Sequence, residues 1–105
     1  MSHGVAVGDL VDSFVVELAA LENSAEFIEG LKGIIARHDI LRLKGFADIP
    51  GKPMRLVIQA VGARVDSYFD RPWNADEARG TRLVVIGLHD IDQQAIRAEI
   101  AGLTG

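Results

Sequence analysis

The chain has 105 residues, of which 49% are hydrophobic and 25% charged, enough for one domain with an ordinary core and too few for two. A formal net charge of −4 without a basic run argues against a nucleic-acid partner, and the absence of Cys excludes a disulfide, a thiolate metal site and a thiol nucleophile. No apolar run approaches the ~18 residues of a membrane span, and the first residues lack the features of a signal peptide, so we expect a cytoplasmic domain without a membrane partner.

The chain is expected to begin with a linker or disordered segment, residues 1–11, which has no sustained period. A first strand follows at SFVVELA, residues 13–19, where apolar residues alternate. Residues 24–37 then repeat apolar side chains with the period of a helix that buries one stripe. Asn23 is the expected N-cap, and Arg37 and His38 suit the negative end of the helix dipole.

The next segment, ILRLKGF (residues 40–46), predicts a second strand with Leu41 and Leu43 toward the core and Arg42 and Lys44 away from it.

Gly45, Gly51 and Lys52 resemble a phosphate-binding loop only superficially. Their spacing is one residue too long, and Pro53 stands where the magnesium-binding hydroxyl must be. The dipeptide at residues 50–51, Pro-Gly, instead predicts a type II turn.

Three further strands are expected at residues 54–62, 65–69 and 82–88, with a tight reversal at 62–63 and a polar loop over 70–81. Asp92 is the expected N-cap of a last helix that buries Ile96, Ile100 and Leu103. The order βαββββα predicts an α+β fold, with a mostly antiparallel sheet of four to five strands and two helices on one face.

The strands at 54–62 and 82–88 are apolar on both alternating faces. Two helices can cover only one face of a sheet. Either the second face therefore carries an apolar patch that needs a partner surface, or these are simply hydrophobic central strands.

No residue pattern in the sequence is a catalytic signature. The best metal candidates are His89, Asp90 and Asp92, which could surround a hard or borderline cation. Acidic residues before a helix are more commonly caps, and we favour that interpretation.

The most individual segment is the loop YFDRPWNADEARGTR, which contains the single Trp. Arg71, Trp73, Arg79 and Arg82 combine a large ring with guanidinium groups, a combination typical of interface anchors. The alternative is structural: Trp73 folds back over the edge of the core, and Arg71 pairs with a nearby aspartate, Asp70 or Asp76.

Three segments, LRLKGFADIPGKPMRLVIQAVGARVDSYFDRPW, DEARGTRLVVIGLHDID and AIRAEI, resemble the C-terminal domain of CobW-type proteins associated with cobalamin biosynthesis. The resemblance covers about residues 12–103, and we assign residues 12–105 to this domain. The resemblance implies a longer parent, in which a P-loop GTPase domain with a C-x-C-C metal-binding motif precedes a domain of this kind. GTP, magnesium and a cargo of cobalt or zinc are implied for that parent.

The chain departs from the parent pattern because it has neither a Walker motif nor a Cys. No catalytic residue, cofactor or metal ligand is therefore carried over to it. The resemblance implies a non-catalytic interaction or regulatory domain of a GTP-dependent metallochaperone, linked to cobalt delivery. Its partners would be the GTPase domain of the same polypeptide and a client protein that receives the metal. An independent ligand-binding or enzymatic domain, or a module for self-association, are the alternatives.

Overall fold

The computed structural model describes residues 11–104 of the chain. The predicted linker lies outside these residues except for Val11, which belongs to the first strand. The elements are β1 (Val11–Leu18), α2 (Ser24–His38), β2 (Ile40–Ala47), β3 (Met54–Val61), β4 (Arg64–Pro72), β5 (Thr81–Leu88) and α3 (Gln93–Gly102).

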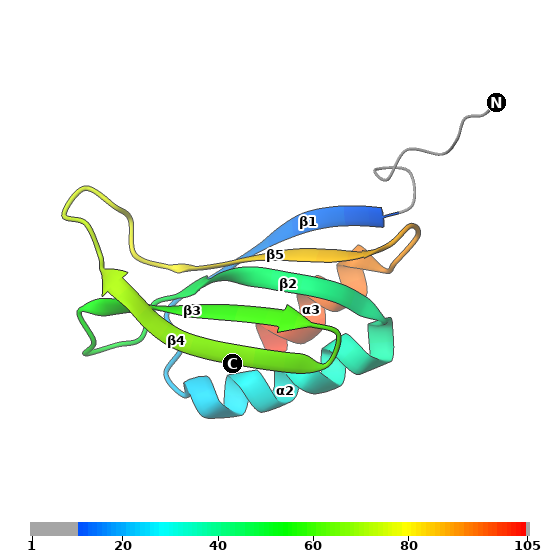
Figure 1. Ribbon diagram of the computed structural model, residues 1–105, viewed down its shortest axis with the longest axis horizontal. Helices are drawn as coiled ribbons and strands as arrows, with labels where there is room; N and C mark the ends of the chain where they lie inside the picture. The colour runs from blue at the N-terminus through cyan, green and yellow to red at the C-terminus, as the bar shows by residue number, and fades with distance from the viewer. Residues whose placement is uncertain (1–10, 105) are drawn as a thin grey trace.

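The strands form one antiparallel sheet in the order β1-β5-β2-β3-β4, and both helices lie against the same face (Figure 1). The predicted α+β fold and its order βαββββα are therefore confirmed. Within residues 11–104, neither helix combines the length and the apolar character needed to cross a membrane.

The core lies between this helix face and the two helices. Buried side chains form a row across the sheet: Phe14 lies opposite Val85, Val85 opposite Leu43, and Leu43 opposite Ala60. The helices bury the stripes that their periodicity predicts: Phe27, Leu31, Ile34 and Ile35 from α2, and Ile96 and Ile100 from α3. The third predicted position of α3, Leu103, is only partly buried.

Both predicted N-caps are present. The Asn23 side chain accepts a hydrogen bond from the Glu26 amide at 3.1 Å, and the Asp92 side chain accepts one from the Ala95 amide at 3.0 Å. Each cap satisfies one of the amides that the first helical turn leaves free.

The predicted type II turn joins β2 to β3. The Lys52 amide donates to the Ile49 carbonyl at 3.1 Å, and Gly51 takes a φ of 79°. This positive φ suits the third position of a type II turn, where a side chain would be strained. The predicted reversal at 62–63 joins β3 to β4, with Val61 opposite Arg64.

Two details of the strands differ from the prediction. Leu41 is 39% exposed and does not face the core, because the pairing of β2 with β5 shifts register between Ile40 and Arg42. The shift adds a residue, so Ile40 and Leu43 both point inward. β4 is also longer than expected: it continues to Pro72, which lies opposite Met54, and so includes the first residues of the predicted polar loop.

Candidate docking surface

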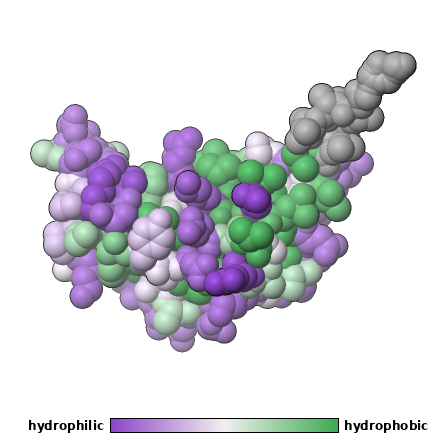
Figure 2. Space-filling view, in the orientation of Figure 1, coloured by the Kyte–Doolittle hydropathy of each residue, from purple (hydrophilic) through white to green (hydrophobic). Residues whose placement is uncertain are grey.

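The face of the sheet opposite the helices, which we call the open face, is covered by no helix of the described residues (Figure 1). Figure 2 looks onto this face and shows apolar side chains gathered toward the side of β1 and β5, with polar side chains over the middle. Several large apolar residues of the chain are well exposed, among them Val61 at 63%, Leu88 at 51% and Tyr68 at 50%. These exposures agree with the first of the two alternatives that the sequence left open, an apolar patch on the second face.

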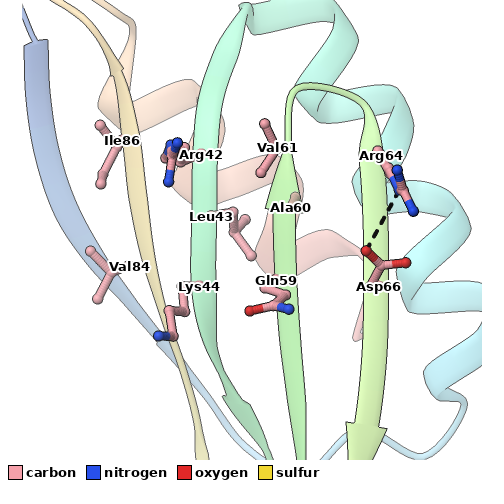
Figure 3. Close-up of a pocket in the computed structure, with 10 residues that line it drawn as sticks. All are labelled: Arg42, Leu43, Lys44, Gln59, Ala60, Val61, Arg64, Asp66, Val84 and Ile86. Carbon is pink, nitrogen blue, oxygen red and sulfur yellow. Dashed lines mark ion pairs between the residues drawn. The ribbon is translucent and has the colours of Figure 1, made fainter.

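A trough of about 660 Å³ crosses the open face over β2, β3, β4 and β5. Its lining, drawn in Figure 3, consists of Arg42, Leu43, Lys44, Gln59, Ala60, Val61, Arg64, Asp66, Val84 and Ile86. The trough is therefore lined by both aliphatic and cationic side chains.

The sheet register places the two cations of β2 in the middle of this trough. Arg42 lies between Ile86 of β5 and Val61 of β3, and one rung further along Lys44 lies between Val84 and Gln59. Figure 3 shows both side chains on β2 with the aliphatic groups on either side. We call Arg42 and Lys44 the β2 cation pair.

Within the described part of the chain, no carboxylate pairs with the β2 cation pair. The trough contains one carboxylate, Asp66, which lies 3.7 Å from Arg64 on its own strand. Within residues 11–104, Arg42 and Lys44 form neither an ion pair nor a side-chain hydrogen bond. Two positive charges thus stand beside aliphatic side chains on an otherwise acidic chain, whose net charge is −4.

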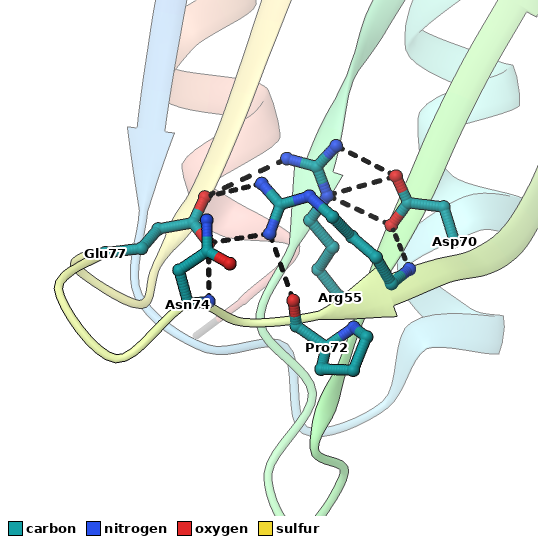
Figure 4. Close-up of polar contacts among 6 residues, drawn as sticks. Arg55, Asp70, Pro72, Asn74 and Glu77 are labelled. Atoms are coloured by element: carbon teal, nitrogen blue, oxygen red, sulfur yellow. Dashed lines mark hydrogen bonds and ion pairs between the residues drawn. The ribbon is translucent and has the colours of Figure 1, made fainter.

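At the other end of the sheet, an arginine–carboxylate network organises the loop between β4 and β5 (Figure 4). Arg71 donates to both carboxylate oxygens of Glu77 at 2.9 Å, and Glu77 also accepts from the Asn74 amide at 3.0 Å. These bonds hold the pKa of Glu77 down to about 2, with the Arg71 contribution the largest. Bidentate pairs of this kind combine strength with a defined orientation.

A second pair in the same network joins β3 to β4. Arg55 donates to both oxygens of Asp70, at 2.8 to 3.1 Å, and this bond lowers the pKa of Asp70. In the structural alternative, the sequence predicted that Arg71 pairs with Asp70 or Asp76. Its guanidinium in fact pairs with Glu77, and only its backbone amide reaches Asp70, at 2.8 Å.

Trp73 lies over β2, the middle strand of the sheet, rather than pointing into solvent. Its ring meets Phe46 edge to face at 5.6 Å between centroids, and the Arg79 guanidinium lies 5.4 Å from its centroid. Arg79 is held in turn by Asp48 at 2.6 Å and by the Lys52 carbonyl at 2.7 Å. The indole Nε1 is buried, and it has no hydrogen-bond acceptor within residues 11–104.

The four predicted partner-binding residues therefore do not form one cluster. Arg71, at the end of β4, and Trp73 and Arg79, in the loop that follows, contact this chain, an arrangement that agrees with the structural alternative for Trp73. Arg82 lies on the open face, opposite Phe46 of β2, and is 54% exposed with a distant ion pair to Glu17 at 3.9 Å. Arg82 is thus the member of the set that a partner on the open face would meet directly.

The three predicted metal candidates, His89, Asp90 and Asp92, are likewise not brought together into one site. His89 lies 3.5 Å from Asp12 and 3.3 Å from Asp90, whereas the Asp92 carboxylate caps α3. Within residues 11–104, no group of three or more His, Asp or Glu side chains could hold a metal ion.

Sequence reasoning did not single out the β2 cation pair as a site. Alternation on β2 correctly placed Arg42 and Lys44 away from the core. Their aliphatic neighbours, however, come from β3 and from β5, which is distant in sequence. The available signal was the two-sided apolar character of those strands, which indicated a surface without showing what lies next to it.

Comparisons with known proteins agree with the resemblance noted above. Residues 11–104 match the family model described as the cobalamin synthesis protein cobW C-terminal domain. The chain is 68% identical over 95 residues to a Sinorhizobium sp. protein named zinc chaperone CobW, covering 90% of this chain and 27% of that protein. It is 58% identical over 88 residues to the Pseudomonas aeruginosa protein of the same name, covering 84% and 23%.

Among solved structures, the chain is similar to the Zn(II)-bound YjiA GTPase from E. coli, with a TM-score of 0.72 and 32% identity over 90% of this chain and 30% of that one. The chain thus spans about a quarter of the length of the relatives that it matches, 27% and 23% for the two chaperones.

Proposed function

The chain belongs to the family of CobW C-terminal domains, and from this membership we propose that it is the interaction domain of a GTP-dependent metallochaperone. Its task is to dock, through the open face, on the P-loop GTPase domain of the parent protein, and in this way to couple nucleotide state to the presentation of metal. The domain itself carries out no catalysis in this proposal.

The single observation that carries the proposal is the open face itself. A sheet face that only met water would be expected to carry polar side chains, with its apolar residues on the core side. Here Val61 is 63% exposed, and Val84 and Ile86 line a trough instead of being covered by the chain's own helices. Exposed apolar surface of this kind is typical of interaction sites.

Zinc is the metal that we propose as the cargo of the parent, because the relatives at 68% and 58% identity are named zinc chaperones. Cobalt for cobalamin biosynthesis, which the family description suggests, is the second candidate. In either case the chain lacks the thiolates that bind such metals most tightly, so the metal would be held elsewhere in the parent, with GTP and magnesium.

Regulation requires that the two nucleotide states make different contacts with this domain. The open face offers such contacts through its trough and through Arg82, and the loop that contains Trp73 borders it. A client protein that receives the metal is the second proposed partner, and it would compete for the domain or join the complex.

The test is a binding measurement between this chain and the part of the Sinorhizobium relative that precedes the matched region. GTP binding by that fragment first establishes that it is folded. Calorimetry should then show a complex whose affinity differs about tenfold between a GTP analogue and GDP, a difference of about 1.4 kcal/mol. The chain alone should bind neither GTP nor Zn²⁺.

A matched pair of variants locates the surface. Val61→Asp places a charge on the open face and should weaken the complex, whereas Ala98→Asp places the same charge on the exposed side of α3 and should not. No binding in either nucleotide state would contradict the proposal. Tight binding of a small molecule by the chain alone would favour an independent binding domain, and concentration-dependent mass without the fragment would favour self-association.

A further inference from the structure

The β2 cation pair indicates the chemistry of the surface that occupies the trough. We propose that the trough receives an amphipathic helix of a partner protein that carries two carboxylates one turn apart, with aliphatic side chains on both sides. This inference rests on the proposed docking function and adds the chemical class of the docked element.

The first argument is charge. Arg42 and Lys44 stand at the centre of the trough without an ion pair within residues 11–104, and the one carboxylate of the lining, Asp66, lies beside Arg64. A partner that covered these two cations without supplying acceptors would leave them desolvated and unpaired, which is strongly unfavourable. The covering surface must therefore bring its own carboxylates.

The second argument is spacing. Arg42 and Lys44 are two residues apart on β2, so their Cα atoms are separated by about 6.6 Å along the strand. Residues four apart on a helix lie on one face at a similar distance, about 6 Å between Cβ atoms. A helix lying along β2 can thus present one carboxylate to each cation without distortion.

The third argument is the apolar flank. Val84 and Ile86 lie on one side of the cation pair, and Val61, at 63% exposure, lies on the other. Aliphatic side chains beside the carboxylates of the helix would pack against these residues and exclude water from the ion pairs. Charge pairs that are shielded from water in this way contribute more than exposed ones.

Neither of the two helices within residues 11–104 offers such a surface from a second copy of this chain. Phe27, Leu31, Ile34 and Ile35 of α2 are buried in its own core and Ile28 is half-buried, so the exposed acidic residues of α2 lack the aliphatic flank on both sides that the trough requires. The exposed side of α3 presents Arg97. A nucleic acid fits no better, because its phosphates would cover aliphatic groups and the chain as a whole is acidic, with a net charge of −4.

The probe is a synthetic helix of fifteen residues or so, held helical by a side-chain lactam on its outer face, because short free helices are marginal in water. It carries two Glu one turn apart with Leu on both sides, and its twin carries Lys at the two Glu positions. Methyl NMR of the chain follows binding at Val61, Val84 and Ile86.

The wild-type chain should prefer the Glu peptide about tenfold, with shifts centred on these methyl groups. The variant Arg42→Glu/Lys44→Glu should reverse the preference and bind the Lys peptide. The control Lys32→Glu/Lys52→Glu has the same change of net charge but lies away from the trough, and it should keep the wild-type preference. Thermal unfolding checks that each variant folds, and Arg42→Gln/Lys44→Gln, which should abolish the preference, serves as the milder replacement.

The inference is overturned if neither peptide binds at millimolar concentration, if the shifts centre elsewhere, or if the control variant also reverses the preference. Tighter binding of a 12-base-pair DNA duplex than of the Glu peptide would overturn it in favour of a nucleic-acid surface. The assay does not use the GTPase fragment, so its failure is distinguishable from a failure of the proposed docking function.

Discussion

Gly45 is the position where a single methyl group should do most damage to the sheet that presents the open face. It lies on β2 opposite Leu83 of β5 and Ile58 of β3. A Cβ at this position would overlap the Arg82 carbonyl oxygen and would lie 2.8 Å from the Leu83 Cα atom. Both obstacles are backbone atoms of a paired strand, so no rotamer change can relieve them.

We therefore expect Gly45→Ala to force β2 and β5 apart. Overpacking of a well-packed core costs typically about 1–3 kcal/mol, and loss of one ladder hydrogen bond adds about 1 kcal/mol, so the free energy of unfolding should fall by about 2–4 kcal/mol. For a domain of this size, that corresponds to a drop in Tm of about 8 °C or more.

Gly30→Ala is the matched control. Its Cβ would also overlap a neighbour, Leu103 Cδ2, but this neighbour is the tip of a partly buried side chain that can turn away. Alanine also raises helix propensity by about 1 kcal/mol over glycine, which offsets the local rearrangement. Urea unfolding followed by Trp73 fluorescence should give a stability within about 1 kcal/mol of wild type. The reasoning is refuted if Gly45→Ala is as stable as Gly30→Ala.

Two further predictions concern carboxylates whose pKa is lowered in the folded chain. Arg71 and a backbone amide hold the pKa of Glu77 at about 2 against an ordinary 4.5, so its contribution to loop order is fully present above pH 4.5 and is lost as the pH falls toward 2. Glu77→Gln should therefore speed amide exchange around Trp73 at pH 7; equal exchange in both proteins would show that the pair does not order the loop. The Glu99 carboxylate accepts hydrogen bonds from Arg37 and His38, and these bonds lower its pKa. Glu99→Gln should therefore lower Tm at pH 7. Because protonation removes the same interaction from the wild type, the Tm difference should shrink as the pH falls below the ordinary range of a carboxyl, and a constant difference across pH would contradict this origin.

Local signals in the sequence predicted most of the fold, because caps and turns depend on neighbouring residues. Asn23 and Asp92 cap their helices as expected, and the turn at Gly51 has the predicted geometry. The position of Leu41 was missed because it depends on a register shift between two strands, which alternation within one strand does not reveal. The partner of Arg71 was missed for a related reason: Glu77 reaches it only after the loop turns back on itself.

The candidate site was harder to predict than the fold because its parts come together only through the strand order. β5 is inserted between β1 and β2, and this places Val84 and Ile86 beside the β2 cation pair, about forty residues away in sequence. Alternation showed that Arg42 and Lys44 face away from the core. It did not show that they would stand among aliphatic neighbours without a carboxylate partner from residues 11–104.

The charged contacts available on the open face also bear on how a domain of this kind would regulate a GTPase. A tenfold change in affinity between two nucleotide states requires only about 1.4 kcal/mol of differential contact. One close ion pair shielded by aliphatic side chains supplies an energy of this order, about 1.5 kcal/mol or more. Making or breaking the contacts of Arg42 and Lys44 would therefore suffice for the proposed regulation. A small movement of the docked helix along β2, without a change in the fold of this domain, could produce that difference, since the two cations are only one rung apart.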